Sequence, residues 1–143
     1  MVLDDILSDF ELLDDWEDRY RYVIELGRSL QPLDDADRSP ENKVQGCVSQ
    51  VWLKSNFDRN EENNFTLIFQ GDSDAMIVKG LIAILISIFS GKTAAEIIEL
   101  DAQAIFKKME LQDHLTAQRS NGLASMMSRI RRDARQVLKA DVS

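Results

Sequence analysis

One cysteine and one histidine are all that this chain of 143 residues offers to thiol and imidazole chemistry. The single cysteine, Cys47, excludes an intramolecular disulfide framework. Cys47 and His114 together cannot complete the usual set of four Cys/His zinc ligands, so carboxylates would have to supply the rest. We therefore expect no metal site and no bound cofactor, and we expect any thiol chemistry to depend on Cys47.

The chain also lacks an excess of positive charge. Its net charge is −8, and nucleic-acid binding needs a basic surface, so no nucleic-acid partner is expected. The densest basic stretch, residues 129–135, lies on a predicted helix that has its own apolar stripe. The acidic balance favours solubility and is compatible with a basic protein partner.

A membrane span and a secretory signal are missing as well. The longest apolar run, residues 75–89, contains Lys79 and falls short of the ~20 residues that a span needs, so we interpret it as a buried core helix. The first fifteen residues have no basic region, no long apolar core and no small-residue cleavage site. With a lone cysteine, these absences predict a cytoplasmic protein.

What is present is ordinary globular composition, with 44% hydrophobic and 29% charged residues. The length suits one domain, residues 1–143. Apolar spacing and capping signals predict helices throughout the chain. In order, these are an opening amphipathic helix, a helix begun by Asp14–Asp15 and ended by Gln31–Pro32, a central buried helix over 75–90, short helices over 94–100 and 102–109, and a long helix over 117–139.

Between the second and third helices, alternating apolar residues predict a β-hairpin. Its strands cover 51–57 and 65–70, and its turn covers 58–63. The segment GDSD (71–74) breaks the second strand and caps the central helix. A third strand over 43–45, or helices, would have to cover one face. The predicted fold class is α+β, with an antiparallel sheet of about three strands packed against the central helix and flanking helices.

Cys47 is the main candidate for chemistry. Most lone cysteines are small buried hydrophobes that occupy periodic apolar positions. Cys47 instead follows Gly46, has Gln45 and Ser49 nearby, and lies on a predicted loop that leads into a strand. Reactive thiols are typically carried by loops of this kind, so we interpret Cys47 as the working residue and its neighbours as loop or partner-contacting residues.

The other candidates are weaker. Nothing in the spacing pairs His114 with Cys47, and the acidic pairs of the N-terminal third are explained by helix capping and solvated faces. The segment 71–74 has neither the spaced glycines nor the lysine of a phosphate loop. Arg119 lies in the first turn of the last helix, where the helix dipole disfavours a cation. Either plain solvation or a carboxylate or anionic partner would account for it.

Five stretches of the chain together form a pattern found in a known family. The most specific part is a cysteine loop followed by VWL and, roughly twenty residues later, by GDSDA. By these the chain resembles the SufE family of sulfur-acceptor proteins, which serve cysteine desulfurases in iron–sulfur cluster assembly. The matching stretches are WEDRYRYVIELG (16–27), DRSPEN (37–42), VQGCVSQVWL (44–53), GDSDAMIVKGLIA (71–83) and QRSNGL (118–123).

The resemblance implies a specific role. The desulfurase, whose cofactor is pyridoxal phosphate, holds sulfur from L-cysteine as a persulfide. Cys47 would accept that sulfur, and binding of this chain would stimulate the desulfurase. The sulfur would pass to a cluster scaffold of the SufBCD type. The implied fold is similar to that of the IscU-type scaffolds. Those scaffolds need three cysteines to hold a cluster, and this chain has one. The resemblance therefore implies that the chain carries sulfur as an accessory protein and is not an enzyme. Asp74 and Arg119 match family positions near the cysteine loop or the partner surface.

Some alternatives stay open at the level of sequence. The paralogue CsdE shares these motifs, so the desulfurase could be SufS-like or CsdA-like, and the chain could be a monomer or a homodimer. A stand-alone thiol enzyme would want a resolving cysteine or an evident base. A non-catalytic binding module with an incidental cysteine would lose no function in a Cys47→Ser variant.

Overall fold

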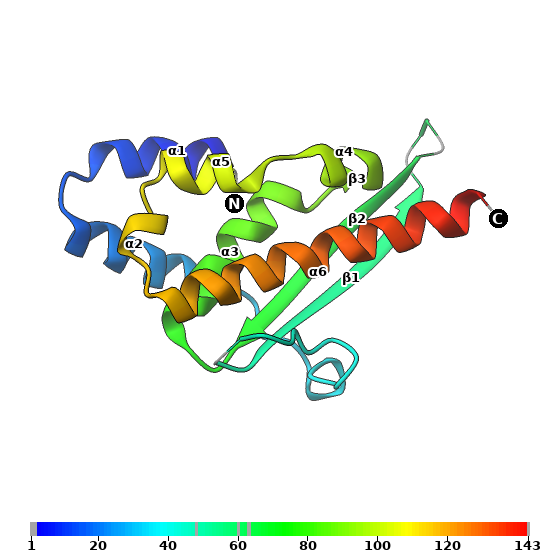
Figure 1. Cartoon of the computed structure of the whole chain (residues 1–143), viewed down its shortest axis with the longest axis horizontal. Helices are drawn as coiled ribbons and strands as arrows, with labels where there is room; N and C mark the ends of the chain where they lie inside the picture. The colour runs from blue at the N-terminus through cyan, green and yellow to red at the C-terminus, as the bar shows by residue number, and fades with distance from the viewer. Residues whose placement is uncertain (1–2, 48, 60, 63, 143) are drawn as a thin grey trace.

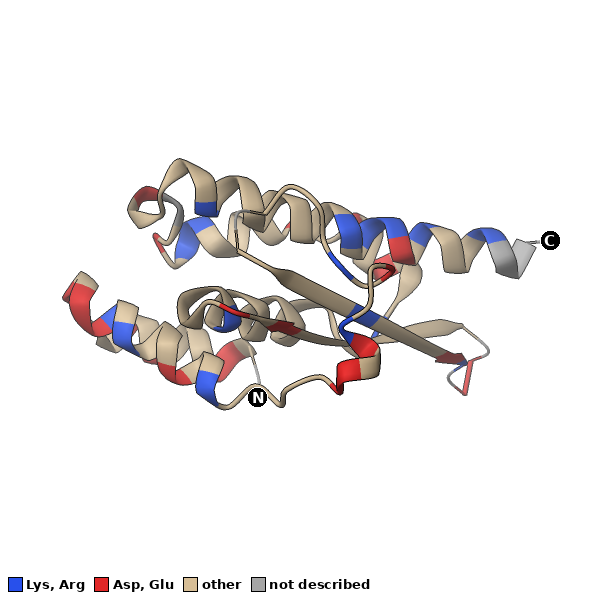
Figure 2. Cartoon of the chain, turned by 90° about the horizontal axis from the view of Figure 1, so that it is seen from below, with Lys and Arg blue, Asp and Glu red and all other residues tan. Residues whose placement is uncertain are grey.

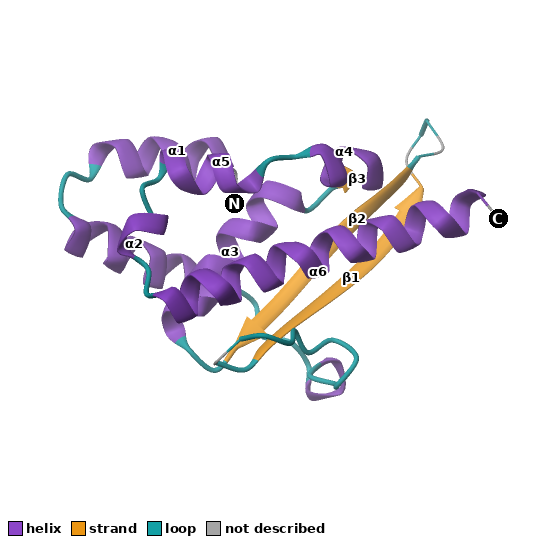
Figure 3. Cartoon of the chain, viewed as in Figure 1, coloured by secondary structure: helices purple, strands orange, loops and turns teal. Residues whose placement is uncertain are grey.

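A computed structural model describes residues 3–47, 49–59, 61–62 and 64–142 of the chain. Within these ranges the fold is α+β, with a three-stranded antiparallel sheet in the order β1-β2-β3 (Figures 1 and 3). The strands are β1 (Val51–Arg59), β2 (Phe65–Ser73) and β3 (Lys92–Thr93). The helices are α1 (Leu3–Leu12), α2 (Trp16–Arg28), α3 (Met76–Phe89), α4 (Ala94–Glu99), α5 (Ala102–Lys108) and α6 (Ala117–Val142), with 3₁₀ turns at Asp35–Asp37 and Gln112–His114.

Different elements pack against the two faces of the β1–β2 ribbon. Leu53, Ser55 and Gly71 belong to the face on which α3 and α6 lie: Ile82 of α3 approaches Gly71, and Asp133 of α6 accepts a hydrogen bond from Ser55. The opposite face carries Trp52, Lys54 and Asp72, and the segment between α2 and β1 crosses part of it. The helical layer therefore lies on one side of the sheet, with α6 running along the ribbon (Figure 1).

The central helix α3 is apolar nearly all round because other elements surround it. Ten of its residues are buried, and they pack with the inner sheet face and with α2. The crossing with α2 is very close: a Cβ added at Gly80 would lie 2.1 Å from the carbonyl oxygen of Val23, and one at Gly27 would lie 2.7 Å from the backbone nitrogen of Gly80. Glycine at both positions is thus what lets the two backbones meet.

Local sequence signals set several element ends. Asp15 is the N-cap of α2 and accepts a hydrogen bond from the Glu17 backbone, while Thr93 and Glu96 form a reciprocal capping box at α4. The apolar stripe predicted on the last helix is confirmed, since its residues are buried or half-buried in the core: Leu123, Met126, Met127, Ile130, Ala134, Val137 and Leu138. The helix itself runs on to Val142, three residues beyond the predicted end at 139.

Three predictions about the sheet were wrong. The third strand is Lys92–Thr93 and not 43–45, because Lys43 makes only a single bridge, to Trp52. The second strand does not break at Gly71, because β2 continues through Ser73, where the buried Asp72 finds polar partners. The predicted turn also began too early: β1 extends through Arg59, and Asn60 and Asn63 of that turn lie outside the described residues.

The α+β class and the three-stranded antiparallel sheet are confirmed. Among the helices described, none combines the length and apolar character needed to cross a membrane.

Candidate functional site around Cys47

The loop that carries Cys47 is closed by backbone pairing. The Val44 N–H donates to the carbonyl of Val51 at 2.8 Å, and the Leu53 N–H donates to the carbonyl of Asn42 at the same distance. These bonds lay the incoming chain alongside the start of β1. Residues 45–47 and 49–50 therefore belong to a short loop at the edge of the sheet.

Asp74 holds the outgoing arm of this loop. Its carboxylate accepts a hydrogen bond from the Gln50 N–H at 3.0 Å, and its own N–H donates to the Gln50 carbonyl at 3.3 Å. Asp74 immediately follows β2 and is exposed. Its position supports the prediction that it acts on the loop, and it ties the residues just after Cys47 to the end of β2.

Gly46 makes the turn that places the thiol. Its φ angle is +88°, in the left-handed region that glycine adopts readily and other residues do not. A Cβ at this position would also lie 2.6 Å from the hydroxyl oxygen of Ser125 on α6. The backbone conformation is therefore what favours glycine next to Cys47, since the Ser125 hydroxyl could rotate away from a Cβ.

The Cys47 thiol is turned toward α6 and is half-buried. Its Sγ donates a weak hydrogen bond to the carbonyl of Gly122 at 3.6 Å. A Cβ at Gly122 would stand 3.5 Å from that sulfur, an ordinary van der Waals distance. A methyl group at this position would therefore still fit beside the thiol, and what holds the sulfur against the helix is the backbone carbonyl of Gly122.

Cys47 lies at the wall of a cavity of about 180 Å³ between the loop, α3 and the start of α6. Its inner wall is apolar, from Val51, Val78, Leu81 and Met126. The remaining lining residues are polar or small, and they are Cys47, Ser49, Thr116, Gln118, Arg119 and Gly122. A thiol here is shielded by apolar groups on one side and faces polar groups on the other.

Arg119 is the charged residue of this cavity. Its backbone N–H is capped by the Thr116 hydroxyl, which accepts at 3.2 Å, but its guanidinium has no hydrogen bond or ion pair within the described part of the chain. It is half-buried. An unpaired guanidinium at the rim of a thiol-lined cavity is available for a carboxylate or another anionic group.

Burial raises the pKa of the Cys47 thiol. We therefore expect its alkylation by iodoacetamide, which needs the thiolate, to rise with pH around a midpoint above that of the same protein unfolded in urea. Because the chain has one cysteine, the measured rate reports on Cys47 alone. A native midpoint equal to or below the unfolded one would contradict this expectation.

The structure brings most of the predicted residues together. Cys47, Ser49 and Arg119 line one cavity, Gly46 forms the turn beside them, and Asp74 anchors the loop. Gln45 is exposed on the other side of the loop, facing a separate hollow. The apolar wall from α3 and the role of Gly122 were not predicted, because they depend on how α6 crosses the loop.

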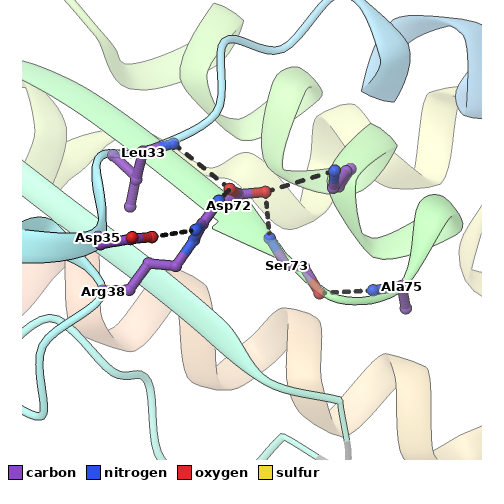
Figure 4. A network of polar contacts seen from close by, with 7 residues as sticks. Leu33, Asp35, Arg38, Asp72, Ser73 and Ala75 are labelled. Carbon is purple, nitrogen blue, oxygen red and sulfur yellow. Dashed lines mark hydrogen bonds and ion pairs between the residues drawn. The ribbon is translucent and has the colours of Figure 1, made fainter.

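A buried carboxylate lies two residues before Asp74 and was also missed. One carboxylate oxygen of Asp72 accepts hydrogen bonds from the Arg38 guanidinium at 2.7 Å and from the Leu33 N–H at 3.3 Å. The other accepts from the Ser73 N–H at 2.8 Å and lies 3.6 Å from the Lys79 ammonium (Figure 4). This network ties the segment before the cysteine loop to β2 and α3. The sequence around it, Gly71-Asp72-Ser73-Asp74, looks like a polar turn and gives no sign that Asp72 is buried.

The weaker candidates remain apart from this site. His114 is exposed and stacks on Trp16, with ring centroids 4.1 Å apart. Across the described ranges, no group of three or more His, Cys, Asp or Glu side chains is placed to hold a metal ion.

Comparison with known sequences gives a consistent result. Residues 4–134 match the SufE family, described as an Fe-S metabolism associated domain. An uncharacterized SufE-like protein of Rhizobium etli is 56% identical over 133 residues, which is 93% of this chain and 89% of that protein. A second uncharacterized SufE-like protein, from Rhizobium meliloti, is 54% identical over 138 residues, or 96% of this chain and 98% of its own.

A solved structure shares the fold. The solution structure of a hypothetical protein from Thermus thermophilus superposes with a TM-score of 0.74 and covers 97% of this chain and 99% of its own. Its sequence identity of 18% limits the likeness to the fold.

Proposed function

This chain belongs to the SufE family, and from that premise we propose that it is a sulfur acceptor that takes persulfide sulfur from a cysteine desulfurase onto Cys47. Membership points to a sulfur-transfer role in iron–sulfur metabolism. The observation that carries the finer proposal is the placement of the lone thiol. It lies on a short loop, half-buried against a cavity, with an unpaired guanidinium at the rim.

The transfer step is a thiol–persulfide exchange. The Cys47 thiolate attacks the terminal sulfur of the donor's cysteine persulfide, a new S–S bond forms on Cys47, and the donor's S–S bond breaks. The donor cysteine leaves as a thiolate, so one sulfur atom moves and no external oxidant or reductant is needed. Pyridoxal phosphate belongs to the desulfurase, and this chain needs no cofactor of its own for the step.

Half-burial gives the resting thiol a protective role. Its raised pKa keeps more of it protonated at neutral pH, and the protonated thiol reacts slowly with peroxide and other electrophiles. Docking of the donor would have to expose the sulfur and favour the thiolate. The left-handed turn at Gly46 gives the loop a pivot for that movement, and the weak bond to Gly122 is easily given up.

The surrounding residues take supporting roles in this proposal. Arg119 would pair with a carboxylate of the partner or with the departing thiolate, since it lines the same cavity as Cys47. Asp74 keeps the outgoing arm in register through Gln50 while the tip moves. Ser49 lines the cavity and Gln45 lies on the outer side of the loop, so a docked donor would contact both.

The proposed partners are a SufS-like or CsdA-like desulfurase and, after it, a scaffold of the SufBCD type. Because the chain has a single cysteine, it can carry sulfur but cannot supply the several thiolate ligands of an iron–sulfur cluster. We also propose that binding stimulates the desulfurase, because removal of its persulfide frees the donor cysteine for another turnover.

The direct test is transfer of labelled sulfur. A type II cysteine desulfurase and L-[³⁵S]cysteine are mixed with this chain, and protein-bound label is followed on non-reducing gels. We expect label on the untreated chain, its loss on reduction, and none on chain alkylated beforehand at its single thiol. Equal labelling of the alkylated and untreated chains would contradict the proposal.

A further inference from the structure

A second hollow lies on the other side of the cysteine loop. It has a volume of about 220 Å³ and runs between the incoming arm of the loop and the middle of α6. Gly46 separates it from the thiol cavity, packed against Ser125, which lines this second groove. The residues of the groove, called here the basic groove, are Lys43, Val44, Gln45, Ser125, Ser128, Arg129 and Arg132.

Positive charge is in surplus in the basic groove. Asp133, which is buried, is held by Arg129 at 3.2 Å and by Arg132 at 3.6 Å, and it also accepts the Ser55 hydroxyl. One carboxylate thus faces two guanidiniums, and the exposed Lys43 adds a third cation with no ion pair inside the described ranges. Two positive charges remain without a counter-charge.

The cations differ in how freely they can bind a partner. The Arg129 side chain is 12% exposed and donates to the backbone carbonyls of Glu41 and Lys43, at 2.7 and 3.4 Å. It forms the wall of the groove and fixes the incoming arm to α6. The Arg132 side chain is 55% exposed, and Lys43 is exposed, so these two present their charges to the outside.

This groove stands out against the charge of the rest of the protein. The chain carries a net charge of −8, yet residues 129–139 hold five basic residues and a single acidic one. Figure 2 shows these Lys and Arg positions gathered along the C-terminal half of α6, whereas Asp and Glu positions dominate elsewhere. The overall negative charge repels an extended polyanion such as a nucleic acid, but a short acidic segment can bind a local basic site.

We propose that the basic groove is the docking site for a carboxylate-bearing segment of the sulfur-donor protein. The inference rests on the proposed function, which requires a donor to cover Cys47. A donor that covers the loop necessarily lies next to the groove, because Gln45 and Cys47 are two residues apart on opposite sides of Gly46. Carboxylates entering between Lys43 and Arg132 would fix the donor's orientation over the thiol.

The test is the affinity for a type II cysteine desulfurase, measured by calorimetry at low and high salt. Lys43→Glu and Arg132→Glu, combined, are expected to weaken binding about tenfold or more and to flatten the salt dependence. Lys107→Glu combined with Lys108→Glu on α5 is the matched control, since it makes the same two charge reversals at exposed positions outside the groove. It should bind like wild type, and all variants should alkylate at Cys47 at the wild-type rate.

The outcomes separate the two proposals. If wild type accepts sulfur but the combined groove variant binds as tightly as the α5 control variant, the docking site is wrong and the proposed function stands. Binding by wild type that does not weaken with salt would likewise overturn the docking site. If wild type neither binds the desulfurase nor accepts sulfur, the proposed function fails and the docking site falls with it.

Discussion

Cys47→Ser is expected to abolish the stimulation of cysteine desulfurase turnover that wild type produces. A serine hydroxyl cannot attack the persulfide at neutral pH and cannot hold a persulfide afterwards, so the donor cysteine stays occupied. The expected loss is complete, to the turnover of the desulfurase alone. The measurement is L-alanine formation from L-cysteine at increasing concentrations of this chain.

The fold of the variant should be nearly unchanged, which makes the result interpretable. The thiol is half-buried and makes one weak hydrogen bond, to Gly122, so the change in the free energy of unfolding should stay within about 1 kcal/mol. Thermal unfolding and far-UV circular dichroism provide this control. Full stimulation by a folded Cys47→Ser protein would show that binding alone is the function.

Asp72→Ala is expected to lower the free energy of unfolding by about 3 kcal/mol, since it removes the acceptor of a buried polar network. The N–H groups of Leu33 and Ser73 would lose their bonds to the carboxylate. Arg38 and Lys79 would lose their counter-charge, although both side chains are about a third exposed and regain water. Urea denaturation measures the difference.

Asp35→Ala is the matched control for this prediction. Asp35 also pairs with the Arg38 guanidinium, at 3.0 Å, but its side chain is fully exposed. Loss of an exposed ion pair should cost less than about 1 kcal/mol. Equal destabilisation by the two variants would show that the buried network contributes no more to the free energy of unfolding than an exposed ion pair does.

The stabilisation from Asp72 should also depend on pH. Burial acts to raise the pKa of this carboxyl, but the bonds from Arg38, Ser73 and Leu33 and the charge of Lys79 outweigh it and lower the pKa below its usual value. The contribution is therefore present above the unfolded pKa of about 3.9 and is lost as the pH falls through the lower folded value. The stability gap between wild type and Asp72→Ala should shrink over that acidic range and stay constant above it.

The sequence was sufficient to place Cys47 on a loop, because Gly46 precedes it and the alternation of β1 follows it. It was also sufficient for most helix boundaries, since the signals at Asp15 and Thr93 are local and act within one turn. The resemblance of the chain to the SufE family rested on sequence motifs, and the comparisons confirm the family.

What the sequence could not supply depends on contacts between distant segments. Whether Cys47 is covered depends on Gly122 of α6, 75 residues away in the sequence. The contribution of Asp72 to stability depends on Arg38, and no sequence periodicity links these two residues. β2 continues through Gly71 for the same reason, since Leu53 and Ile82 pack around a glycine that looked like a strand breaker. The basic stretch of α6 was noted, but its place beside the cysteine loop required the fold.

The most direct test of the central claim is the intact mass of the chain after incubation with a type II cysteine desulfurase and L-cysteine, followed by peptide mapping. The proposal predicts a reducible gain of one sulfur atom, located on the peptide that contains Cys47 and absent from Cys47→Ser. No gain on wild type with a desulfurase shown to bind it, or a gain of the same size on Cys47→Ser, would contradict the assignment of Cys47 as the sulfur carrier.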